Sequence, residues 1–145
     1  LAALDRLLNQ ESGLLGLSGV SNDMRDVRAA ALSGHEAAGE ALAVFVYRLR
    51  KTVGAYAAAM GGLDGVIFTG GIGENDAQTR EEAVAGLAFL GLELAPERNR
   101  KHETVISRDL SRVKILVIKT DEERMIAEGA LAALGEKVVY EDAGY

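Results

Sequence analysis

The sequence of 145 residues has no cysteine, no tryptophan and one proline, and aromatic residues make up 5% of it. Without cysteine there can be no disulfide bond, thiolate nucleophile or cysteine-based metal site, and a reducing cytoplasmic location fits. The apolar stretches are all shorter than the ~20 residues that a membrane-spanning helix needs. No leader of charged and then apolar residues opens the chain. We therefore expect a cytoplasmic protein with no membrane partner.

Positive charge is also scarce, with 16 Lys and Arg residues against 22 Asp and Glu residues and a formal net charge of −6. The basic residues are scattered among acids, so the sequence lacks the clustered positive face that nucleic acid needs. We expect no nucleic-acid partner. The hydrophobic fraction of 48% and the charged fraction of 26% are typical of a globular domain with one core. The first residue, Leu1, already lies in a helical pattern, so we expect a piece of a longer protein.

The first 19 residues combine a helical pattern with a glycine-rich segment. Leucines with helical spacing in residues 1–8 predict a helix, and the glycines of residues 11–19 predict a loop. Leu14, Leu15 and Leu17 fall in that loop. Exposed leucines commonly mark a docking surface, so this segment is predicted to contact another surface or a second copy of the chain.

A long helix is predicted next. Asn22 or Ser21 can cap a helix that starts at Asp23, and the glycine pair at 61–62 can end it. The core-facing residues predicted from heptad-like spacing are Leu42, Phe45, Val46, Leu49, Val53, Tyr56, Ala57 and Met60. The stripe predicts that one face of this helix is buried.

Apolar runs and helical patterns alternate in the rest of the chain. Strands are predicted at 66–69 and 113–118, a short edge strand at 105–106, helices at 76–90 and 120–134, and a further strand at 138–140. The continuous apolar run at 66–69 is typical of a strand covered on both faces. The order of strand, helix, strand and helix predicts an α/β fold with parallel strands. Ligands of such sheets bind beyond the carboxyl ends of the strands, where Gly70, Gly71 and Thr120 fall.

The run from Gly65 to Asn75 passes from a strand through glycines into a helix. Glycines let the backbone approach a bulky anion, and the amides that open a helix can face it. An ordinary strand-to-helix turn would give a similar pattern. A dinucleotide fingerprint requires glycine where this chain has Asp76, which disfavours an oxidoreductase, and no Gly-Lys-Ser/Thr triplet is present, which excludes a P-loop.

Four blocks of sequence together resemble the carboxyl-terminal part of acetate kinases. They are LNQESGLLGLSG at 8–19, SNDMR at 21–25, FTGGIGEN at 68–75 and TDEE at 120–123. Their order and spacing also match, and the resemblance covers nearly the whole chain. It implies an α/β domain of the actin/hexokinase-like (ribonuclease H-like) kind, with a mixed sheet and helices packed on both faces. Residues 1–145 would then be a single nucleotide-binding domain, the carboxyl-terminal part of a longer two-domain kinase.

The resemblance also implies an activity. Acetate kinases reversibly transfer phosphate from ATP to acetate, giving acetyl phosphate and ADP with Mg²⁺, and a cytoplasmic homodimer is implied. The family's catalytic histidine and arginines lie earlier in its chain, so no catalytic residue is expected here and this chain alone should be inactive. A propionate or butyrate kinase fragment is a close alternative. A non-catalytic nucleotide-binding or interaction domain of the same fold is an alternative of another class.

Two segments match the nucleotide-contacting segments of the family: Asp23, Met24 and Arg25, and then Gly71, Ile72, Gly73, Glu74 and Asn75. The carboxylate of Asp23 can accept hydrogen bonds from ribose hydroxyls, and the Arg25 guanidinium can stack or bind phosphate. Ile72 can form an apolar wall for adenine. From the residues alone, the favoured interpretation of Asp23 is an acid in the first turn of a helix, placed to interact with the helix dipole, and the resemblance reverses that preference.

Glu122 matches the family's magnesium-associated glutamate. A structural role is the alternative, because Thr120 and Glu123 have the spacing of a capping box. This chain has Lys119 and Asp121 where the family usually has proline and asparagine, so an additional acid would lie beside the metal.

Four polar residues are predicted to be structural or solvated, Asn75 in addition to its nucleotide contact. Asn75 and Gln78 have the spacing of a helix cap with its reciprocal partner. His35 and His102 are predicted to be solvated, because both lie among charged residues or at helix boundaries.

Overall fold

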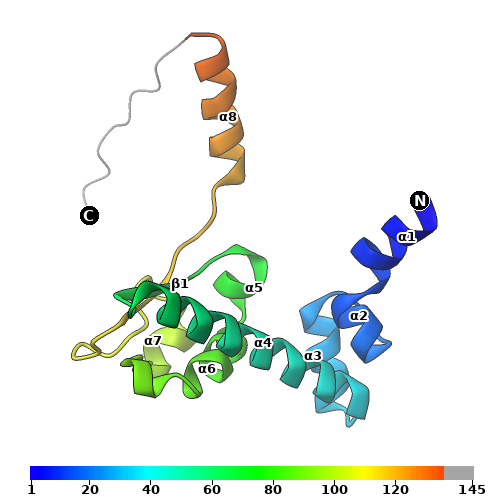
Figure 1. Cartoon of the computed structure of the whole chain (residues 1–145), viewed down its shortest axis with the longest axis horizontal. Helices are drawn as coiled ribbons and strands as arrows, with labels where there is room; N and C mark the ends of the chain where they lie inside the picture. The colour runs from blue at the N-terminus through cyan, green and yellow to red at the C-terminus, as the bar shows by residue number, and fades with distance from the viewer. Residues whose placement is uncertain (136–145) are drawn as a thin grey trace.

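The computed structural model describes residues 1–135. Helices dominate it, and α1 and α8 both project from the body (Figure 1). Its elements are α1 (Ala2–Arg6), the π-helical turn η1 (Leu7–Glu11), α2 (Gly13–Ser18), α3 (Met24–Leu32), α4 (Glu36–Met60), β1 (Gly65–Phe68), α5 (Gly70–Asn75), α6 (Ala77–Ala85), the 3₁₀ turn η2 (Ala88–Leu90), α7 (Pro96–Arg100), β2 (Lys114–Val117) and α8 (Glu122–Ala133).

The two strands pair in parallel, with Gly65 opposite Lys114 and Phe68 opposite Val117. Val105 forms an antiparallel bridge with Leu116 in β2, in agreement with the short edge strand predicted there. The described chain is therefore a mixed α/β structure with two parallel strands and mostly helices. This confirms the parallel order that the apolar runs predicted.

The main core lies where β2 meets the segment after α6. Its buried members are Val84, Leu87, Leu92, Ile106, Val113, Ile115 and Val117. β1 is less covered than its apolar run predicted: Ile67 is 56% exposed, while its neighbours Val66 and Phe68 are half-buried. Among the described residues, the expectation that this strand is covered on both faces is therefore wrong.

Replacing Ile115 by valine should cost about 1 kcal/mol of unfolding free energy, because the side chain is fully buried and one methylene is lost. The matched change Ile67→Val in the neighbouring strand should cost much less, since that side chain is largely in water. Urea denaturation followed by circular dichroism measures both. Equal losses would contradict the burial difference between the strands.

The single long helix predicted from Asp23 to Gly61 is in fact two helices. Asp23 itself caps α3, since its carboxylate accepts a hydrogen bond from the Arg25 amide. Gly34 adopts a left-handed conformation (φ +90°) that ends α3, and His35 caps α4 by accepting from the Ala38 amide. His35 thus has a structural role, although it is exposed as expected.

The core-facing stripe predicted for α4 is only partly right. Val46 and Ala57 are buried, but Tyr56 and Met60 are 63% and 66% exposed. The far end of α4 therefore presents part of its apolar face to solvent.

The predicted glycine-rich loop is a helix, α2, which packs against α4. Leu14 contacts the small core between α3 and α4, and Leu15 is half-buried, so only Leu17 of the three leucines is exposed. Packing of these leucines outweighs the low helix propensity of glycine. The interaction-domain alternative relied on three exposed leucines, and it loses that support.

Helix boundaries near the glycine turn also differ from the prediction. Residues 70–75 form helix α5 rather than an open turn, and α6 is capped by Asp76, not Asn75. The helix predicted over 76–90 ends at Gly86 and is followed by η2. Asp121 caps α8 through the Arg124 amide, so the capping box predicted from Thr120 is wrong.

The two helices at the ends of the described chain have exposed apolar faces. No residue of α1 or α8 is buried, and Figure 1 shows both projecting from the body. The inward face predicted for α8 is wrong: Met125 and Ile126 are 67% and 73% exposed. No helix among residues 1–135 has the length and apolarity needed to span a bilayer. The strand predicted at 138–140 lies outside the described residues.

Candidate functional site

A pocket of about 790 Å³ lies between α3 and α5, and both sequence segments singled out above contribute to it. Its lining residues are Asn22, Asp23, Met24, Arg25, Arg28, Ala29, Leu32, Gly71, Ile72, Asn75 and Asp76. Asp23 and Gly71 are far apart in sequence, so the fold brings together two segments that only the resemblance had linked. Gly73, Glu74 and Glu122 are not among the lining residues.

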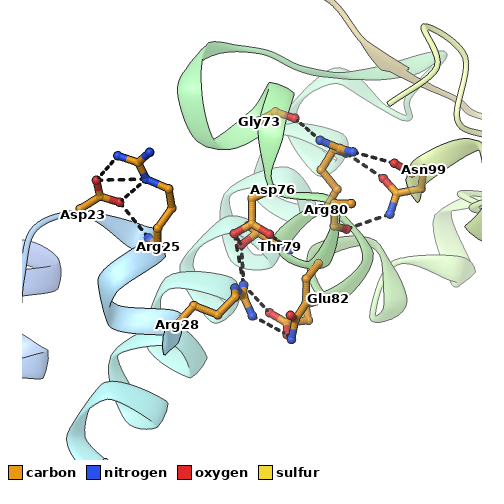
Figure 2. Close-up of polar contacts among 11 residues, drawn as sticks. Asp23, Arg25, Arg28, Gly73, Asp76, Thr79, Arg80, Glu82 and Asn99 are labelled. Carbon is orange, nitrogen blue, oxygen red and sulfur yellow. Dashed lines mark hydrogen bonds and ion pairs between the residues drawn. The ribbon is translucent and has the colours of Figure 1, made fainter. Parts of the chain in front are cut away.

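Asp23 and Arg25 form an ion pair at the rim of the pocket, as Figure 2 shows. The Arg25 Nη2 donates to Asp23 Oδ2 at 2.6 Å, and the Arg25 backbone amide donates to Oδ1 at 2.8 Å. These hydrogen bonds hold the pKa of Asp23 at about 2, below its ordinary 3.8. The Arg25 side chain is 89% exposed, so it is free to reach a ligand. The carboxylate therefore serves as helix cap and as ion-pair partner at once.

An NMR titration should find the Asp23 pKa near 2, and Arg25→Ala should raise it toward 3.8, because the largest cause of the shift is the Arg25 side chain. A folded-state pKa below the unfolded value means that this group stabilises the fold fully above pH 3.8 and progressively less as the pH falls toward 2. An unchanged Asp23 pKa in the variant would show that the ion pair is absent in solution.

Arg28 joins α3 to α6 beneath the pocket. Its Nη2 donates to Thr79 Oγ1 at 2.7 Å, and the guanidinium forms ion pairs with Asp76 and Glu82 (Figure 2). The side chain is only 14% exposed, so these interactions are little screened by solvent. Burial acts to raise the pKa of Asp76, but hydrogen bonds from Thr79 and the charge of Arg28 outweigh it and lower the pKa. Arg28 thereby fixes one wall of the pocket relative to the other.

The glycines of α5 have distinct roles. Gly70 has φ +71°, a left-handed conformation that starts the helix directly after β1. A Cβ on Gly73 would lie 3.1 Å from the carbonyl carbon of Phe68, so a side chain at this position would crowd the end of β1. A Cβ on Gly71 would meet nothing within 4 Å. Gly71 is therefore the glycine of α5 that leaves space for a ligand, while the other two serve the fold.

A fully buried arginine, Arg80, anchors α5 from below. Its Nη1 donates to the carbonyl oxygens of Gly73 and Glu74 at 2.7 and 3.0 Å, and its Nε donates to Asn99 Oδ1 at 2.7 Å (Figure 2). Burial lowers the pKa of the guanidinium, and the charge of Asp76 partly offsets this. The exposed His102 has φ +53°, and its Nδ1 lies 2.8 Å from the Glu74 carbonyl oxygen. His102 therefore contacts the protein rather than being simply solvated.

The Glu74 carboxylate is not part of the pocket lining. Its Oε1 accepts hydrogen bonds from the amides of Gly70 (2.9 Å) and Thr120 (2.8 Å) and from the Thr120 hydroxyl (3.0 Å). The Thr120 amide is the largest cause of the lowered pKa of Glu74. The amide of Gly70, which opens α5, is thus already satisfied by the protein. Glu74 connects the glycine turn to the segment before α8.

Glu122 lies in the first turn of α8 and is exposed. Within residues 1–135 there is no group of three or more His, Cys, Asp or Glu side chains that could hold a metal ion. A Mg²⁺ ion commonly takes one or two carboxylates and completes its shell with phosphates and water. Among the described residues, Glu122 therefore does not form a metal site by itself.

Sequence reasoning missed Arg28 and Arg80, the two arginines that hold the pocket walls. Neither belongs to a block that carried the resemblance. The structural role of Asp76 had one local signal in the sequence: its spacing to Thr79 is that of a helix cap.

Comparison with known proteins identifies the family. The sequence profile of the acetokinase family matches residues 1–128. The chain belongs to the acetokinase family. Among acetokinases, it is 49% identical over 135 residues to the acetate kinase of Phocaeicola vulgatus and 50% identical over 138 residues to the propionate kinase of Citrobacter koseri. These alignments cover 92% and 94% of this chain but 34% of each relative.

The fold of this acetokinase chain also matches a solved relative. The crystal structure of Porphyromonas gingivalis acetate kinase superposes with a TM-score of 0.83 at 43% sequence identity, covering 92% of this chain and 34% of that one. The chain therefore spans about a third of the length of the acetokinases it resembles.

Proposed function

We propose that this chain is the nucleotide-binding part of an acetokinase that transfers phosphate reversibly between ATP and a short-chain carboxylic acid, with acetate and acetyl phosphate as the first candidate pair. The observation that carries the proposal is the single pocket lined by both Asp23–Arg25 and the exposed face of α5. Family membership supports the reaction class. The fold would be the actin/hexokinase-like one, and the chain the carboxyl-terminal part of the enzyme.

Residues from both walls would hold ADP or ATP. Asp23 would accept hydrogen bonds from ribose hydroxyls, and the exposed Arg25 guanidinium would stack on the base or bind phosphate. Met24 and Ile72 would supply apolar contacts, while Gly71 and Asn75 would border the nucleotide. Gly73 and Glu74 would support α5 from behind rather than touch the ligand.

Glu122 would hold a Mg²⁺ ion together with the nucleotide phosphates. When bound, the ion would neutralise phosphate charge, which is its usual role in phosphoryl transfer. The groups that clamp the transferred phosphate would come from the rest of the enzyme, because the chain spans 34% of its relatives. We therefore expect little or no turnover by this chain alone.

The proposed phosphate acceptor is a short-chain carboxylic acid. The chain is about equally identical to an acetate kinase and to a propionate kinase, so propionate, and with it butyrate, are alternatives to acetate. The proposed cellular setting is the cytoplasm and the proposed assembly a homodimer, as the family resemblance implied.

Calorimetric titration of the chain with Mg-ADP tests the proposal. We expect saturable binding that Asp23→Ala weakens, because the carboxylate of Asp23 borders the pocket. Asp23 also caps α3, so a matched control is needed: His35→Ala removes the cap of the next helix but lies outside the pocket. Absence of ADP binding, or equal weakening in both variants, would contradict the proposed site.

A further inference from the structure

The position of α8 depends strongly on its connection to the strands and to α5. No residue of α8 is buried, so little packing holds the helix itself. The segment before it is held by two contacts: the Ile118 amide donates to the Phe68 carbonyl at 3.0 Å, and Thr120 donates twice to Glu74. Thr120 is two residues before Glu122. The Glu74 contact is therefore close to the start of α8 and to its proposed magnesium ligand.

The Glu74 carboxylate is well suited to connect two segments. One oxygen, Oε1, accepts the Gly70 amide within its own helix and both donors of Thr120, which lies 46 residues away in sequence. Hydrogen bonds to a carboxylate are stronger than those to a neutral acceptor. Because Glu74 lies in α5 together with Gly71, Ile72 and Asn75, the helix that borders the pocket is bonded directly to the segment that leads into α8.

We infer that Glu74 is a positioning residue that couples α5 to α8, so that occupation of the pocket by a nucleotide is transmitted through Thr120 to Glu122. This inference rests on the proposed nucleotide site. Glu74 acts through its hydrogen bonds and does not touch the nucleotide. The coupling would position the carboxylate of Glu122, the residue proposed to hold Mg²⁺ together with the nucleotide.

Variants at both ends of the contact separate coupling from folding. Glu74→Ala removes the shared acceptor, but α5 keeps the two hydrogen bonds from Arg80 to its carbonyl oxygens. Glu74→Gln keeps an oxygen at the same position and loses only the charge, so it should retain the contact in weaker form. Thr120→Val removes the hydroxyl donor without altering α5, and Thr120→Ser is its matched control.

The experiment is amide NMR of this chain during titration with ADP. In the wild type, we expect chemical-shift changes at residues 71–75 and also at 120–122. In Glu74→Ala, the changes at 71–75 should persist while those at 120–122 disappear, and Glu74→Gln should restore them in part. Without ADP, the exchange protection of the Thr120 amide should fall roughly tenfold or more in Glu74→Ala, because a charge-assisted hydrogen bond is lost.

The outcomes separate this inference from the proposed function. Shift changes at 71–75 with none at 120–122 in the wild type would overturn the coupling and leave the nucleotide site intact. Equal changes at 120–122 in the wild type and in Glu74→Ala would also overturn it. No change in either segment would overturn the nucleotide site and, with it, the coupling.

Discussion

Replacing Arg80 by methionine should destabilise the chain by about 3–5 kcal/mol, a large part of the stability of an ordinary domain. Methionine keeps an apolar stem but has no donors. Several oxygens would lose a donor: the side-chain oxygen of Asn99 and the carbonyl of Gly73, and in part the carbonyls of Glu74 and Asn99, the latter of which also accepts the His102 amide. An unpaired buried acceptor costs about 1–3 kcal/mol, and the fully buried site admits little water to compensate.

Urea and thermal denaturation followed by circular dichroism measure this loss, which corresponds to a melting temperature lower by roughly 10 °C. Arg6→Met is the matched control: that side chain is 71% exposed and pairs only with Glu11 among the described residues, so its loss should change stability by less than about 0.5 kcal/mol. If Arg80→Met unfolded at the wild-type urea concentration, the guanidinium would not anchor α5 as described.

Gly71→Val should weaken ADP binding roughly 5- to 150-fold while leaving the fold intact. The expected loss of 1–3 kcal/mol is that of extra atoms forced into an occupied space. In the ligand-free chain the new side chain would project into open space, since a Cβ there meets nothing within 4 Å. Valine also has a higher helix propensity than glycine, so α5 should not lose stability.

Gly73→Val is the informative comparison, because the two glycines lie in the same short helix. A Cβ on Gly73 would press against the Phe68 backbone at 3.1 Å, so this variant should lower the melting temperature. Calorimetry and thermal denaturation of both variants separate the effects. If Gly71→Val lowered the melting temperature as strongly as Gly73→Val does, together with the affinity for ADP, an ordinary turn with no ligand above it would be favoured instead.

The sequence predicted those parts of the fold that depend on local patterns. Both strands and their parallel order followed from the apolar runs, and a short edge strand at Val105 was also predicted. The two segments that line the pocket were identified from the resemblance, but their proximity depends on the tertiary fold. The glycines of residues 11–19 predict a loop because glycine has low helix propensity, whereas the contact of Leu14 with the core between α3 and α4 stabilises a helix there.

The supporting residues of the site could not be predicted because their partners are distant in sequence. Arg28 bonds to Glu82, which is 54 residues away in sequence, and Arg80 bonds to Asn99, which is 19 residues away. Nothing in the local sequence distinguishes these arginines from solvated ones. The same holds for Glu74, whose partner Thr120 is 46 residues away.

The ion pair of Asp23 with Arg25 bears on which ligands the pocket can select. A bare anion that took Arg25 would leave the Asp23 carboxylate without its side-chain partner, and an apolar ligand would bury both charges at a cost. A molecule with hydroxyl groups and an anionic oxygen close together could replace both partners. Its hydroxyls would donate to Asp23, and its anionic oxygen would accept from Arg25. The pocket would therefore favour ligands that return as many hydrogen bonds as they displace.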